Sequence, residues 1–256
     1  MRGAVIYGPK DVRLHERPDP TIQQPTDAIV RTVAACVCGS DLWRYRGVQR
    51  VARPTPIGHE YVGVVEAVGT DVTSVKPGQF VVGGFLTSDN TCAVCRAGMQ
   101  SHCLHGTGYD GCQAEFIRIP NADGTLLATP EHPGDDLVPS LLALSDVMCT
   151  GWHAAVCAEV KPGATVVVVG DGAVGLSGVL AARQLGAERV IAMSRHADRQ
   201  HSRWSSAPPT SSPSAATRAS NASRTSPAAS ERMRCWNASA PTTPWFRRCA
   251  RPDPAR

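Results

Sequence analysis

The sequence lacks any long hydrophobic run. Its longest apolar stretch, ATVVVV at 164–169, is far shorter than the roughly 20 residues that a membrane-spanning helix needs. The N-terminal MRGAVIYGPKDVRLHERPDP also lacks the continuous apolar segment of a signal peptide. We therefore expect a cytoplasmic protein without a membrane partner, in which the ten cysteines act as metal ligands or buried thiols rather than as disulfides.

Residues 201–256 contain no Leu, Ile or Val. They include eleven Ser and eight Pro, so they can bury too little apolar surface to offset the entropy lost on ordering. Nine Arg against two acidic residues in this segment also account for the positive net charge of the chain. We therefore predict that 201–256 is disordered and adds no strand to a sheet, and we expect no nucleic-acid partner.

The first 200 residues have the pattern of an α/β protein with a β-rich N-terminal part. Short apolar runs between turn signals, from AVIYGPKDVRL to QAEFIRIP, predict a small β-barrel or sandwich over 1–120. Apolar residues at helical spacing, Leu137, Leu141, Leu144 and Met148, predict one helix there. ATVVVVG, GAVGLSGVLAARQLGA and ERVIAMSR then predict a strand, a helix ending at Gly186 and a parallel strand.

A glycine motif joins the first of these strands to its helix. Gly170, Gly172 and Gly175 form G-x-G-x-x-G, which permits a tight turn, close approach of a pyrophosphate and close packing of helix on strand. A tight turn without a ligand is the alternative. The candidate dinucleotide-binding residues are Gly170, Gly172, Ala173, Val174 and Gly175.

The second strand ends without the acidic residue that usually accepts the ribose 2′-hydroxyl of NAD. Ser194 and Arg195 stand there instead and could receive a 2′-phosphate, which favours NADP over NAD. The alternative is that Arg195 is a solvated cation at a strand end.

A second group of residues has the chemistry of a zinc site. Cys38 in CVCGSD and His59 in GHEYVGVVEAVG are suitable zinc ligands, and Glu60 could occupy an open position. Taken singly, each is more often a core or structural residue.

CGSD, GHEYVGVVEAVG, DVTSVKPGQFVV and KPGATVVVVGDGAVG, in this order and spacing, resemble the medium-chain zinc-dependent alcohol dehydrogenases over residues 1–200. The resemblance implies a GroES-like catalytic domain at 1–150. It also implies the first part of a Rossmann domain at 151–200, with the active site in the cleft between the two.

The resemblance also implies roles for individual residues. Cys38, His59 and Asp146 would be ligands of a catalytic zinc, and Glu60 would exchange with water or substrate. Ser40 would hydrogen-bond the substrate hydroxyl and relay its proton. Asp41 would orient His59. Trp43 departs from the family, because many members have a relay histidine there.

Cys92, Cys95 and Cys103 resemble the family's structural-zinc lobe with one cysteine missing. Three thiolates are one ligand short of a closed tetrahedral site. Asp89, His102 or His105 could complete it, or the lobe could be metal-free.

The codons suggest an origin for the tail. Read one base earlier, RMRCWNASAP at 232–241 permits ADAVLECVGT, and HSRWSSAPPTSS at 201–212 permits ALALEFGATDIV. Both are like segments of a Rossmann half. One base lost near codon 200 would therefore place 201–256 out of frame, and the alternative is a natural basic tail.

We therefore predict the N-terminal portion of a zinc-dependent alcohol dehydrogenase that transfers hydride between a small alcohol and NADP, in a truncated and inactive copy. The full-length family often forms homo-oligomers, which is doubtful for this chain. The alternatives are a zinc-free NADPH reductase of the same superfamily and a non-catalytic zinc-binding remnant.

Overall fold

A computed structural model describes residues 1–193 and the strand at 234–237. The chain divides into two compact units, Met1–Asp146 and Val147–Arg256. The fold is α/β with a β-rich N-terminal part, as predicted. Within the described residues, no helix has both the length and the apolar character to cross a membrane.

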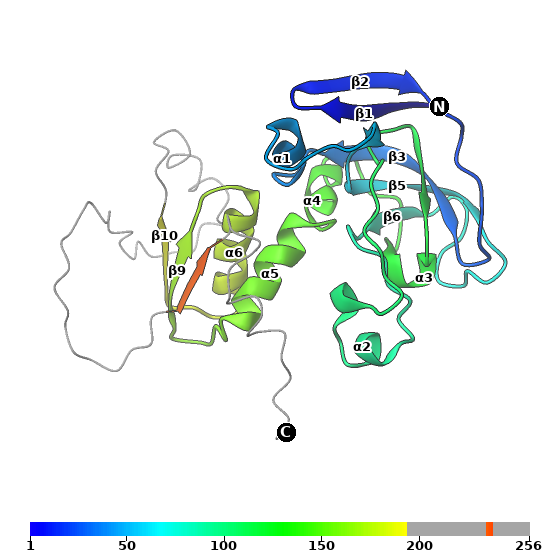
Figure 1. Cartoon of the computed structure of the whole chain (residues 1–256). Coiled ribbons are helices and arrows are strands. Elements are labelled where there is room, and N and C mark those ends of the chain that lie inside the picture. Colours follow the sequence, from blue (N-terminus) through cyan, green and yellow to red (C-terminus); the bar gives the residue numbers. More distant parts are fainter. Residues whose placement is uncertain (194–233, 238–256) are drawn as a thin grey trace. The chain divides into compact units, whose positions relative to one another are not determined.

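The first unit is built around an antiparallel five-stranded sheet (Figure 1). Its order is β7-β3-β5-β6-β8. The strands are β3 (Ala28–Cys36), β5 (Glu60–Val68), β6 (Phe80–Gly83), β7 (Phe116–Ile119) and β8 (Leu126–Ala128). Val, Ile and Ala side chains of these strands form the core, because β-branched residues pack well on a pleated surface. Tyr61, which is fully buried, is the largest side chain in it.

A second sheet in this unit has the order β2-β1-β4. Its strands are β1 (Arg2–Gly8), β2 (Asp11–Glu16) and β4 (Thr55–Pro56). The strands of residues 1–146 therefore form two separate sheets, and the closed barrel that was one of the two expectations is not formed. The short helices of the unit are α1 (Asp41–Tyr45), α2 (Ala93–Arg96), the 3-10 helix η1 (Gln100–His102), α3 (Ala122–Thr125) and α4 (Val138–Ala143).

The helix predicted around Leu137 to Met148 is present, but it is interrupted. It is divided into α4 and α5 (Val147–Cys157). The Ser145 hydroxyl donates a hydrogen bond to the carbonyl of Leu142 at 2.6 Å, a local bond that competes with continued helix. Leu142 is the buried leucine and packs on β5 and β6, whereas Leu137 and Leu144 are exposed. The break leaves Asp146 outside both helices.

The second unit has the predicted β-α-β order (Figure 1). β9 (Thr165–Val169) pairs in parallel with β10 (Arg189–Met193), and α6 (Ala173–Gln184) connects them. α5 packs closely on α6. At Gly151 the two helices are so near each other that a Cβ would lie only 2.6 Å from the backbone nitrogen of Gly178. The apolar core of this unit joins β9 to these two helices.

The expectation that 201–256 adds no strand is wrong at one place. β11 (Arg234–Asn237) pairs in parallel with the free edge of β9, opposite β10. The expectation came from side-chain composition, whereas the hydrogen bonds of a ladder use backbone groups that every non-proline residue has. The rest of that prediction lies outside the described residues.

One buried ion pair holds the start of β3. The carboxylate of Asp27 is 1% exposed and accepts hydrogen bonds from Arg118 Nε at 2.7 Å and from the backbone N–H groups of Gln23 and Gln24. Burial by itself raises the pKa of Asp27, but these donors outweigh it and hold the pKa below its usual value. The stabilisation is therefore complete above the unfolded-state pKa of about 3.9 and is lost as pH falls through the lowered value.

We predict that Asp27→Asn lowers the free energy of unfolding by about 2–3 kcal/mol, because the amide leaves Arg118 without its anion. Urea denaturation followed by circular dichroism measures the loss. Asp11→Asn is the control, because it breaks an exposed pair with Arg13 and should cost much less than Asp27→Asn. Equal losses in the two variants would contradict the prediction.

Candidate active site

The pairing of β3 with β5 brings together two sequence motifs. Cys36, the last residue of β3, lies opposite Glu60, the first residue of β5. Cys38 follows the end of one strand and His59 precedes the start of the other. Because the strands are antiparallel, both residues lie at the same end of the β3–β5 pair.

A glycine is required directly before the histidine. Gly58 has a φ of +95°, and a Cβ there would lie 2.4 Å from the side chain of Gln113. Its carbonyl accepts backbone hydrogen bonds from Gly111 and Cys112 at 2.8 and 3.1 Å. The segment that contains Asp110 therefore lies beside His59.

Asp146 reaches the same place from the break between α4 and α5. Its Oδ2 lies 3.6 Å from Cys38 Sγ and 3.5 Å from His59 Nε2. With Glu60 included, the four ligand atoms all lie within 4.8 Å of one another. Ligands on a tetrahedral zinc lie roughly 3.3–3.8 Å apart, given bond lengths of about 2.0–2.3 Å. The residues present therefore fit a zinc ion.

Glu60 gives independent support for a cation. The residue is 3% exposed, and its Oε1 is buried without a hydrogen-bond partner. Burial, followed by the charge of Asp146, raises the pKa of its carboxyl group. A buried oxygen without a partner costs free energy, and a positive ion beside it would remove that cost.

The imidazole of His59 is 14% exposed and faces a different partner on each nitrogen. Nε2 lies 3.4 Å from Ser40 Oγ on the side of Asp146, and Nδ1 lies 3.6 Å from Asp41 Oδ1. Burial by itself lowers its pKa, but Asp110, Asp146 and the other acidic neighbours outweigh this and raise the pKa to about 12. Without a metal, the surrounding negative charge keeps the imidazole of His59 protonated.

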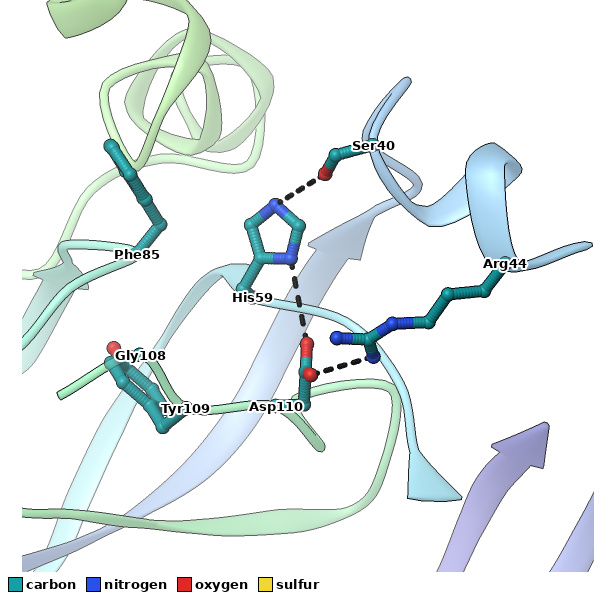
Figure 2. A pocket seen from close by; sticks show the side chains of 7 residues that line it. All are labelled: Ser40, Arg44, His59, Phe85, Gly108, Tyr109 and Asp110. Atoms are coloured by element: carbon teal, nitrogen blue, oxygen red, sulfur yellow. Dashed lines mark hydrogen bonds and ion pairs between the residues drawn. The ribbon is translucent and has the colours of Figure 1, made fainter. Parts of the chain in front are cut away.

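The site opens into a pocket of about 340 Å³ (Figure 2). Five of its lining residues were not identified from the sequence, because no motif marks them: Arg44, Phe85, Gly108, Tyr109 and Asp110. Arg44 Nη1 donates to Asp110 Oδ2 at 2.7 Å. Trp43 lies on α1 with 38% of its surface exposed.

The cysteine lobe around α2 forms a second candidate metal site. Asp89 lies with Cys92, Cys95 and Cys103 in a group whose ligand atoms are all within 4.8 Å, and two of the sulfurs are 3.9 Å apart. Of the three residues considered as a fourth ligand, Asp89 is the one in this group. His105 contacts Asp89 through Nδ1 at 2.5 Å.

The backbone of this lobe also favours thiolate at Cys92, whereas burial raises the pKa of Cys95 to about 12. The sulfur of Cys92 accepts a hydrogen bond from the backbone N–H of Cys95 at 3.4 Å. Backbone hydrogen bonds, first from Leu104 and then from Cys95, lower the pKa of Cys92 to about 7. A thiol with such a pKa is readily deprotonated, which metal binding requires.

The glycine motif lies at the start of α6. Gly170 has a φ of +114°, and a Cβ on Gly175 would lie 2.3 Å from the carbonyl oxygen of Gly170. Gly172 is the N-cap residue without a side-chain cap, and a Cβ on it would meet nothing within 4 Å. Ala173 and Val174 begin the helix, so free backbone N–H groups lie beside open space that suits an anion. Ser194 and Arg195 lie outside the described residues.

Comparisons with known proteins show what this chain is similar to. Residues 24–131 match the alcohol dehydrogenase GroES-like domain. Zinc-type alcohol dehydrogenase B of Aspergillus flavus is 37% identical over 204 residues, which cover 75% of this chain and 47% of that protein. The medium chain reductase/dehydrogenase ucsI of Acremonium sp. is 38% identical, over 71% of this chain and 65% of that protein.

A solved structure gives the same result. Alcohol dehydrogenase TADH from Thermus sp. ATN1 superposes with a TM-score of 0.74 at 34% identity, over 80% of this chain and 61% of that one. About three quarters of the chain is thus a segment of the medium-chain zinc-type alcohol dehydrogenase family. The chain spans about half to two thirds of the length of these curated relatives.

We predict two separable zinc equivalents per chain by atomic absorption. Cys38→Ala should remove one and Cys92→Ser the other, because each deletes a thiolate from a different group of ligands. His102→Ala, which changes an exposed histidine of the same lobe, should remove neither. An unchanged zinc content in Cys38→Ala would contradict the assignment of the first site.

Proposed function

We propose that the protein is the zinc-binding portion of an alcohol dehydrogenase that oxidises a small alcohol to an aldehyde or ketone reversibly. The observation that carries the proposal is the convergence of Cys38, His59 and Asp146 beside the buried, unpartnered oxygen of Glu60. In this proposal residues 1–150 form the catalytic domain and 151–200 the first part of a Rossmann domain.

In such a reaction, different residues of the site would have different roles. A zinc held there would act as a Lewis acid toward the substrate oxygen. Ser40 faces the pocket and would hydrogen-bond the substrate hydroxyl and take up its proton. Asp41 would hold the Nδ1 edge of His59. Glu60 lies within 4.8 Å of the other ligand atoms, so it could occupy the position that water or substrate otherwise takes.

The cofactor in this proposal is NADP rather than NAD. The helix start at Gly172, with open space beside it, supports a pyrophosphate site. The preference for NADP comes from the sequence alone, in which Ser194 and Arg195 replace the usual acidic residue.

Two other functions predict a different relation between the metal and activity. A zinc-free NADPH reductase would retain activity after Cys38→Ala. A non-catalytic remnant would bind zinc at Cys38 without any turnover. The unpartnered oxygen of Glu60 favours a metal and therefore disfavours the zinc-free reductase.

We predict that Arg195→Ala weakens NADPH binding at least tenfold more than NADH binding, because only NADPH has the 2′-phosphate that an arginine can pair with. Fluorescence titration of both cofactors in a chain with its reading frame restored after codon 200 measures this. Arg189→Ala, on the exposed start of β10, is the matched control. Equal losses of both cofactors would show that Arg195 does not contact the phosphate.

We further propose that residues 201–256 result from one base lost near codon 200. The 256-residue chain should then show no alcohol-dependent NADP reduction, because a dinucleotide site needs both halves of the doubly wound sheet. Insertion of one base near codon 200 should restore turnover, measured as absorbance of NADPH. Resequencing of the locus is the control. Robust turnover by the unchanged chain would contradict the proposal.

A further inference from the structure

The imidazole of His59 faces two carboxylates on one side. Nδ1 lies 3.6 Å from Asp41 Oδ1 and 3.7 Å from Asp110 Oδ1, and both acids are largely buried. Figure 2 shows the contact with Asp110. Nε2, on the opposite edge of the ring, faces Asp146 and Ser40. Because Nδ1 carries a single hydrogen when Nε2 binds a metal, only one carboxylate can accept it fully at a time.

The two carboxylates are held in different ways. Asp41 lies at the start of α1, and its Oδ2 accepts the backbone N–H of Cys38 at 3.0 Å, so it also fixes the loop that supplies the thiol. Asp110 is held by Arg44, which donates to its Oδ2 at 2.7 Å and leaves Oδ1 toward His59. The side chains of Arg44 and Asp110 are 27% and 24% exposed, so this ion pair is shielded more than a surface pair.

We propose that Asp110, held by Arg44, is a positioning residue that fixes the orientation and tautomer of His59 for metal binding. The inference rests on the proposed function, because it concerns the same metal site. A carboxylate that accepts the second N–H of a metal-binding histidine makes the imidazole a stronger ligand. Arg44 cancels the charge that Asp110 adds. The site therefore gains a hydrogen-bond acceptor without a further net negative charge beside Glu60 and Asp146.

The geometry explains why a second acceptor is useful. Asp41 Oδ1 at 3.6 Å and Asp110 Oδ1 at 3.7 Å both lie farther from Nδ1 than a normal hydrogen bond of about 2.7–3.2 Å, so neither carboxylate holds the ring by itself in this arrangement. The other oxygen of Asp41 accepts the backbone N–H of Cys38. Asp110 comes from a different segment, which backbone hydrogen bonds of Gly111 and Cys112 fix to the carbonyl of Gly58. His59 is thus restrained from two directions.

Two variants separate an acceptor role from a charge role. Arg44→Ala/Asp110→Asn and Arg44→Ala/Asp110→Leu both keep the net charge of the pair at zero, and Asn and Leu are similar in size. In the first, the amide oxygen is free to accept the Nδ1 hydrogen, since the competing guanidinium is absent. In the second, no acceptor is present at position 110.

The full 256-residue chain, stripped of metal, is titrated with Co²⁺ and, in competition with a chelator, with Zn²⁺. The equivalent that Cys38→Ala removes is the one followed. The leucine variant should bind it ten- to a hundredfold more weakly than the unchanged chain, with altered visible absorption of bound Co²⁺. The asparagine variant should bind within about fivefold of the unchanged chain. Arg31→Ala/Glu66→Leu, an exposed ion pair on β3 and β5, should have no effect.

Circular dichroism of each metal-free variant checks that it folds, and Arg44→Ala/Asp110→Ala replaces the leucine variant if that one does not. Equal affinities of the asparagine and leucine variants would overturn the role of Asp110 alone. A fall in unfolding stability with unchanged metal affinity would do the same. Absence of any Cys38-dependent equivalent in the unchanged chain would overturn the metal site itself.

Discussion

The central constraint on this structure is the amount of negative charge that surrounds one imidazole. A thiol and four carboxyl groups approach His59, most of them with little exposure to water. Cys38 and Asp41 come from one segment, Glu60 is adjacent to His59, and Asp110 and Asp146 come from two further segments. Like charges in a half-buried space repel and are poorly solvated, so a positive charge at the centre of the group, whether a proton on His59 or a metal ion, lowers its free energy. The sheet register, the glycine before His59 and the break before α5 all serve to bring these groups together.

The sequence predicted those parts of the site that lie in continuous motifs. Cys38, Ser40 and Asp41 are within four residues of one another, and the glycine loop is one turn of chain between a strand and a helix. The glycine loop is recognised from its own spacing, whereas the roles of Ser40 and Asp41 are implied by the resemblance of the CGSD motif to the family. Asp110 and Arg44 meet only because the chain after Tyr109 pairs with Gly58. No local pattern contains that information.

The errors have a similar cause. The leucine spacing at 137–148 describes a helix correctly only if nothing interrupts it, and the hydroxyl of Ser145 does so by bonding back to Leu142. Composition likewise excluded a strand in the tail, although β9 offers an open edge to any backbone. The apolar runs of 1–120 identified the strands but not how they divide between two sheets, because pairing depends on residues far apart in the chain.

The position of Asp146 has a consequence for how this segment can vary. It is the last residue of the first compact unit, and α5 begins with the next residue. One inserted or deleted residue between Leu144 and Val147 would shift a carboxylate away from Cys38 and His59, and it would also rotate the start of a helix by about 100°. Surface loops usually tolerate changes of length. This junction is therefore a connection whose length is fixed, because the same few residues both complete a site and begin the next part of the chain.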